Sequence, residues 1–151
     1  MCPKGDDPLT ASVDYRTIKI STKSSSGALS GSFRFSFNGL SFSFPAAWTE
    51  ALCEDAFSEL QNIEQVSCQI SANANGLSNN LDITVNIFAF PSVPYENNIY
   101  SNDGNPDLSY FSCDATAAVG TGASCTISDI SGISYPGSLL FTLFFFDIVK
   151  N

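Results

Sequence analysis

A phenylalanine-rich hairpin constrains the fold of this chain more than any other feature of its sequence. Between residues 33 and 44, large apolar side chains alternate with serine and arginine on both sides of Asn38-Gly39. Asn-Gly is typical of a two-residue type I′ turn, because both residues tolerate positive φ. Folding about this turn places six large side chains on one face of a two-stranded sheet and the polar ones on the other. The six are Phe33, Phe35, Phe37, Leu40, Phe42 and Phe44.

One amphipathic helix is predicted directly after the hairpin, over about residues 49–64. Pro45 ends the second strand, Thr49 is a suitable N-cap, and the acidic residues that follow lie near the positive end of the helix dipole. Apolar residues then recur at helical spacing and form an inner stripe of Leu52, Cys53, Ala56, Phe57, Leu60 and Ile63. We interpret the acidic face as solvated surface rather than as a pair of catalytic carboxylates.

Alternation of apolar and polar residues predicts further strands on both sides of this helix. Residues 15–21 alternate weakly and are predicted to form an edge strand. The other predicted strands are residues 66–70, 81–90, 125–133 and 139–149. The predicted loops are the Ser-Gly turn 24–27, the polar loop 73–80, the long connection 91–108 and a small, flexible segment 115–124. The pattern therefore predicts a mainly β fold with one helix, namely a β-sandwich (Ig-like or related) with the amphipathic helix packed on it.

A chain of 151 residues is long enough for one domain with a real core. We expect residues 1–12 to form a leader or linker and residues 13–151 to form a single sandwich domain. The longest apolar run, residues 139–146, is too short to cross a bilayer as a helix, so no membrane span is expected.

Charge and the absence of histidine exclude several classes of function. The chain has 6 Lys and Arg against 15 Asp and Glu, a formal net charge of −9, which argues against nucleic acid as a partner. Without histidine, a Ser-His-Asp or Cys-His arrangement cannot form, and without a Cys-x-x-Cys pair a zinc site is not supported. We therefore expect no enzymatic activity. Apart from Lys150, the basic residues all precede position 35, and this asymmetry either guides head-to-tail stacking or only reflects an acidic, soluble body.

Calcium is the one cofactor that the sequence leaves open. Asp103, Asn105 and Asp107 have the alternating spacing of oxygen ligands in a calcium loop. The distal bidentate glutamate is missing, however, and Pro106 stiffens the segment. Because the same residue types are common in turns, a turn is the preferred interpretation and no cofactor is expected.

The 5 cysteines suggest two internal disulfides and one remaining thiol. Cys53 lies on the inner stripe of the helix and Cys68 points the same way from the next strand, so the two could meet, with a reduced, buried Cys53 as the alternative. Cys113 and Cys125 bracket a loop that a disulfide would close. Cys2 precedes the domain and is left for a partner or a neighbouring unit.

The beginning of the chain carries a motif of its own, Cys2-Pro3-x-Gly5-Asp6-Asp7-Pro8-x-Thr10. Three further pieces follow it in order, the hairpin 31–39, the helix 50–63 and the loop 103–108. Together they resemble a repeat of large extracellular proteins from stramenopile algae and oomycetes, with related repeats in bacterial surface proteins. The resemblance covers roughly residues 2–115 and implies a structural or adhesive module at the cell surface, outside the cell.

The resulting hypothesis is a structural subunit or repeat of an extracellular filament or surface appendage that assembles head to tail with itself. Its alternative is an adhesin-type binding module for a glycan or another surface protein. O-linked glycans stay open because serine is abundant, whereas no Asn-x-Ser/Thr sequon occurs. Residues 139–146 are apolar on both faces, so this run is either a central strand of its own sandwich or a strand docked on the next subunit. The predicted assembly residues are Cys2, Pro3, Asp6, Asp7, Phe141, Phe144, Phe145 and Phe146.

Overall fold

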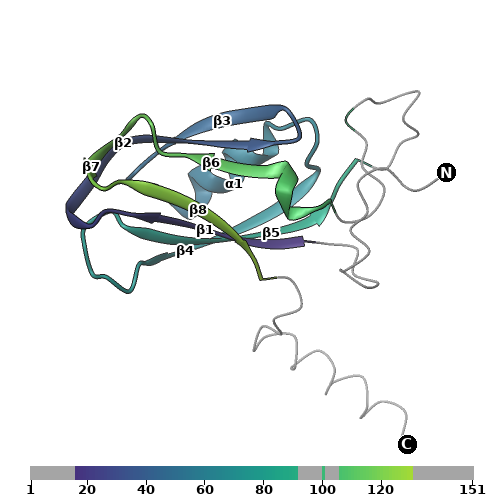
Figure 1. Cartoon of the computed structure of the whole chain (residues 1–151). Helices are drawn as coiled ribbons and strands as arrows, with labels where there is room; N and C mark the ends of the chain where they lie inside the picture. Colours follow the sequence, from purple (N-terminus) through teal and green to yellow (C-terminus); the bar gives the residue numbers. More distant parts are fainter. Residues whose placement is uncertain (1–15, 92–99, 101–105, 131–151) are drawn as a thin grey trace, which may run out of the picture.

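The computed structural model describes residues 16–91, 100 and 106–130, which form a β-sandwich of two antiparallel sheets with one α-helix (Figure 1). The first sheet has the strand order β4-β5-β1-β8 and the second the order β3-β2-β6, with β7 pairing to β2. The strands are β1 (Arg16–Lys23), β2 (Ser26–Phe37), β3 (Leu40–Pro45), β4 (Gln65–Ala72), β5 (Leu81–Ala89), β6 (Phe111–Asp114), β7 (Ala118–Thr121) and β8 (Ser124–Asp129). The helix is α1 (Glu50–Ser58), and a short 3₁₀ turn, η1 (Leu108–Tyr110), precedes β6.

The phenylalanine hairpin forms with the predicted turn and register. Asn38 and Gly39 have φ values of 47° and 88°, as a type I′ turn requires. β2 and β3 pair residue for residue, from Phe37 with Leu40 to Phe33 with Phe44. Phe33, Phe35, Phe37 and Phe44 are buried, and Leu40 and Phe42 are half-buried. Turn chemistry and apolar alternation therefore determine this register together.

The core lies between the hairpin's apolar face and the inner face of the first sheet. Phe35 contacts Phe57 of α1 at 4.8 Å between ring centroids, and Phe37 stacks on Phe111 at 4.4 Å. Trp48 stacks on Phe44 at 4.4 Å, just before the helix begins. The opposite wall is aliphatic and fully buried, and consists of Ile18, Ile20, Ile83, Val85 and Ile87.

The prediction that residues 15–21 form an edge strand is wrong, because β1 is a central strand between β5 and β8. Its alternation is weak because its outward-facing residues are polar and bond to the neighbouring strand. Thr17 is buried on the outer face, where its hydroxyl donates to Oδ1 of Asn86 at 3.1 Å. Lys19, which suggested an exposed edge, forms an ion pair with Asp82 of the neighbouring strand at 2.9 Å. Polar residues can therefore occupy a central strand when its neighbours bond them.

The helix is shorter than predicted. Thr49 is the N-cap and accepts a hydrogen bond from the Leu52 amide, as expected, but α1 ends at Ser58 instead of near residue 64. Leu60 and Ile63 are buried in the turns that follow. The prediction that Leu52 belongs to the inner stripe is also wrong, since this side chain is 52% exposed.

One predicted loop contains more order than its composition suggested. The small segment 115–124 includes β7, which pairs with the first half of β2. This pairing depends on Gly31, where φ is +77° and a Cβ atom would lie 2.5 Å from the Ala117 carbonyl oxygen. β8 ends at Asp129, earlier than predicted. The predicted strand 139–149, the leader 1–12 and most of the long connection 91–108 lie outside the described residues.

Phe35→Ala is expected to lower the free energy of unfolding by about 3–5 kcal/mol, because the ring is fully buried among other aromatic rings. Urea denaturation at neutral pH measures this loss. Val119→Ala is the control, since Val119 is 62% exposed and should change stability by less than about 0.5 kcal/mol. A similarly small loss at Phe35 would contradict the sandwich.

Candidate assembly surfaces

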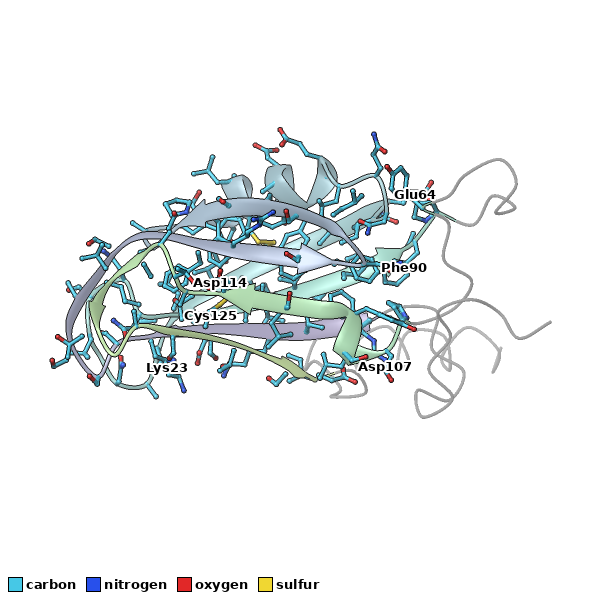
Figure 2. All side chains as sticks on the ribbon, turned by 45° about the horizontal axis from the view of Figure 1, so that its top comes forward. Lys23, Glu64, Phe90, Asp107, Asp114 and Cys125 are labelled. Atoms are coloured by element: carbon cyan, nitrogen blue, oxygen red, sulfur yellow. A yellow bond between two sulfur atoms is a disulfide. The ribbon has the colours of Figure 1, made fainter. Side chains whose placement is uncertain are left out.

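The two predicted disulfides form, and they close opposite sides of the sandwich. Cys53 of α1 bonds to Cys68 of β4, and Cys113 of β6 bonds to Cys125 of β8. Figure 2 shows one sulfur pair beneath the helix and the other near Cys125. Each bridge therefore joins elements at a side where the two sheets would otherwise part.

The first side is closed by the helix, which bonds the edge of β4 with two glutamates. A carboxylate oxygen of Glu54 accepts from the Cys68 amide at 3.1 Å, and one of Glu50 accepts from the Ile70 amide at 3.0 Å. Glutamates four positions apart lie one turn apart on one helix flank, and alternate strand residues direct their amides to the same edge. Their spacing matches, so α1 caps the β4 edge against further pairing.

The second side brings the edges of β6 and β8 together without a shared ladder. The two strands belong to different sheets, and the Cys113–Cys125 bridge holds their Cα atoms 5.6 Å apart. The bridge closes a short loop that contains β7, so it restricts the conformations of the unfolded chain and holds the two sheets together in the folded one.

The outer edge of β3 is the exception to this pattern. The Ala46 amide bonds to the Gly31 carbonyl, and the Asn38 amide bonds to the Tyr110 carbonyl. In an antiparallel pair, successive amides point alternately to the two sides of a strand. The two bonds above therefore show that the amides of the even-numbered residues of β3 point to β2. The amides of Ser41 and Ser43 therefore point to the outer edge, and neither has a hydrogen-bond acceptor among the described residues.

The two ends of the sandwich differ in what they carry. β1 begins, β5 ends and β8 ends at the same place, as Figure 1 shows and as the pairing of Arg16 with Ile87 requires. We call this the proximal end, and Phe90 and Asp107 lie there in Figure 2. Its buried charge is Arg16, fully enclosed and 3.1 Å from the Asp129 carboxylate. The described chain breaks off here toward residues 1–15, 92–99, 101–105 and 131–151.

The opposite or distal end is internally bonded and poor in charge, with the exposed Lys23 at the end of β1. Its three segments, residues 24–31, 73–80 and 115–123, contain no Asp, Glu, Lys or Arg. The buried Asn80 accepts through Oδ1 from the Ser24 hydroxyl at 3.1 Å and from Nδ2 of Asn75 at 3.0 Å. Nδ2 of Asn79 donates to the Leu29 carbonyl at 2.8 Å. The loop predicted to be merely polar thus ties β4, β5 and the start of β2 into one ordered cap.

Asp82 is a carboxylate with three side-chain partners, which lie on β1 and in the loop 73–80. It accepts from the Ser21 hydroxyl at 2.7 Å and from Nδ2 of Asn73 at 2.8 Å, and it pairs with Lys19. Burial raises the pKa of Asp82, but the hydrogen bonds from Ser21, Lys19 and Asn73 and the Lys19 charge together lower it below the ordinary value. The ionised form therefore stabilises the contact between the distal cap and the first sheet.

The candidate calcium loop is only partly described. Asp107 is the N-cap of η1 and accepts from the Ser109 amide at 2.8 Å, and this backbone bond lowers the pKa of Asp107. Asp114 likewise bonds Thr116 in the next turn, which lowers the pKa of Asp114. Asp103 and Asn105 lie outside the described residues, within which no group of three metal-ligating side chains occurs. Asp107 thus has the role that the turn interpretation gave it.

The predicted assembly residues lie elsewhere in the chain. Cys2, Pro3, Asp6, Asp7, Phe141, Phe144, Phe145 and Phe146 all fall outside the described residues, so their roles stay predictions. Sequence reasoning also missed the glutamate cap of β4. The signal was available as Glu50 and Glu54 one helical turn apart, but spacing alone does not show which strand the helix will accompany.

Comparisons with known proteins add no relative. No protein-family model, curated protein or solved structure matches this chain. Among the residues that the structure describes, no helix has the length and apolarity needed to cross a membrane.

Glu54→Ala is expected to lower the free energy of unfolding by about 1 kcal/mol, because the half-buried Cys68 amide bond loses its charged acceptor. Hydrogen exchange of the Cys68 amide, followed by NMR, should become faster. Asp55→Ala is the matched control, since it removes the same charge from the neighbouring, exposed position of α1. Equal exchange rates in the two variants would contradict the cap.

Asp82→Asn is expected to reduce stability in a pH-dependent way. A carboxylate whose folded pKa is lowered contributes stability that is fully present above its unfolded pKa, roughly 4, and is lost as the pH falls through the folded pKa. Urea denaturation at a series of pH values should therefore show the largest difference between wild type and Asp82→Asn near neutrality and a shrinking one below about pH 4. Asp55→Asn on the exposed helix surface is the control, and a difference that grows in acid would refute the assignment.

Proposed function

We propose that this chain is a structural subunit or repeat of an extracellular filament or surface appendage, which assembles head to tail with copies of itself. The observation that carries the proposal is the difference between the two ends of the sandwich. The distal end is an internally bonded cap whose three segments carry no charge beyond the neighbouring Lys23, whereas the proximal end holds Arg16 and Asp129, where β1 begins and β8 ends. A unit with unlike ends supports heterologous contacts, which build open filaments when they do not close into a ring.

The covalent construction of the unit supports the same function. Two disulfides tie the helix to the first sheet on one side and the two sheets together on the other. Cross-links of this kind keep a subunit folded under mechanical load and outside the cell, and they persist in oxidising compartments. The extracellular location is inferred from this chemistry together with the resemblance of the leader, hairpin and helix motifs.

The sequence outside the described fold supplies the connecting material. Residues 2–10 carry Cys2 and the acidic pair Asp6-Asp7, and residues 139–146 are uncharged and apolar on both faces. A bare strand of the latter composition would aggregate, so it requires cover on both faces. In the proposed filament, a neighbouring subunit provides part of that cover.

Deletion of residues 139–151 is expected to give a folded monomer that no longer forms filaments. Both disulfides and the described sandwich lie before this segment, so the circular dichroism of the sheets should be retained. Sedimentation velocity and electron microscopy of the intact and truncated chains measure assembly.

Two other outcomes would reject the proposal. Failure of the truncated chain to fold would make the segment part of the intramolecular core. An intact chain that stays monomeric at every concentration and binds immobilised glycans would instead favour the adhesin-type module.

A further inference from the structure

We propose that the outer edge of β3 is the acceptor site for residues 139–146 of a second copy of the chain. The inference rests on the proposed function and adds to it the surface on which the donated strand binds. It is carried by the contrast between β3 and β4, because the helix supplies acceptors to the outward amides of β4 and to none of those of β3 among the described residues.

The edges of β4, β6 and β8 are covered by neighbouring elements. The β4 edge is capped by Glu50 and Glu54 of α1, with bonds of 3.0 and 3.1 Å. The edges of β6 and β8 face each other across the Cys113–Cys125 bridge. On β3, by contrast, the amides of Ser41 and Ser43 point outward without an acceptor among the described residues, and Ser43 is exposed. Two such amides, two residues apart, are what a pairing strand requires.

An apolar strip lies beside this edge on the helix. Cys53 and Phe57 of α1 face the core, and Glu50 and Glu54 face β4. At 100° per residue, Leu52 and Ala56 then lie on the opposite flank, toward β3. Leu52 is 52% exposed and Ala56 half-buried. A strand added to β3 would cover this flank with every second side chain, which explains why the helix carries a leucine that its own core does not use.

Charge selects the donated segment over a two-fold pairing of β3 with β3. α1 contains Glu50, Glu54, Asp55 and no basic residue, and Glu59 follows it directly. A two-fold contact across β3 would bring two such acidic helices close together, at a cost in repulsion. Residues 139–146 carry no charge, so their approach to the same edge incurs no such cost.

The length of the connecting chain also fits a neighbouring subunit. In a head-to-tail stack, the segment leaves the proximal end of one copy and meets the distal end of the next. Pro45 pairs with Ser32, and β2 begins at Ser26, so the nearer end of β3 lies roughly 20 Å from the distal end. Residues 131–138 can extend over roughly 27 Å, enough to span this gap. The donated strand would then run antiparallel to β3, as all described strand pairs do.

Ser43→Pro tests the edge directly in the full chain. Proline removes the outward amide without breaking a bond to β2, and edge strands tolerate proline at such positions. We expect thermal stability close to that of the wild type and a rise of about tenfold or more in the critical concentration for filament formation. Ser43→Ala, which keeps the amide, should assemble as the wild type does. An unchanged critical concentration in folded Ser43→Pro would overturn the proposal.

Photo-crosslinking identifies the occupant of the edge. The full chain with Ser41→benzoylphenylalanine is mixed in ¹⁴N and ¹⁵N forms, assembled, irradiated and mapped by mass spectrometry. Crosslinks from position 41 to residues 139–146 that join light and heavy chains support the proposal. Crosslinks within one chain, crosslinks to β3 of another copy, or filaments without a crosslink at this position overturn it and leave the proposed function standing. A folded chain that never assembles overturns both.

Discussion

Burial of the phenylalanine face of β2 and β3 is the constraint on which the rest of this structure depends. The rings of Phe33, Phe35 and Phe37 are too large to be covered by one sheet alone, so a second sheet and a helix must pack against them. The aliphatic face of β1 and β5 covers them from below, and Phe57 of α1 covers them from the side. The position of α1 follows from this need, because the helix fills the side of the sandwich where the hairpin's outer rings would otherwise meet water.

The helix's position in turn determines which strand edges are available. Once Phe57 is directed inward, helical geometry turns Glu50 and Glu54 toward β4 and Leu52 onto the opposite flank of the helix. The outward amides of β4 therefore bond to charged acceptors on the helix. The outward amides of β3 have none of these acceptors, and the exposed side chain on that flank of the helix is apolar. The burial of Phe57 thus makes the two flanks of α1 chemically different. Proteins usually protect exposed edges with charge or bulges, so an edge left with an apolar border is best explained by a partner strand.

Much of the fold could be predicted from the sequence where local chemistry and apolar period agree. The hairpin register, the Thr49 cap and both disulfides follow from residues close to one another or on one predicted face. The failures share a different cause. The central place of β1, the exposure of Leu52 and the order of the Asn80 cap depend on partners far along the chain, Asn86, β4 and Ser24 among them. Propensity and period carry no information about such partners.

For the candidate assembly site, too, the sequence supplies one part of the argument and the structure the other. Composition predicts that residues 139–146 form a strand that needs cover on both faces, yet it cannot say what provides the cover. The structure contributes the complementary half, an edge with two outward amides, together with an exposed Leu52 on the helix flank that faces away from β4. Neither half alone specifies an interface, because apolar strands also occupy cores and short edges also stay solvated. Their combination is specific, since a charge-free strand and an edge bordered by an acidic helix suit each other better than either suits a second copy of itself.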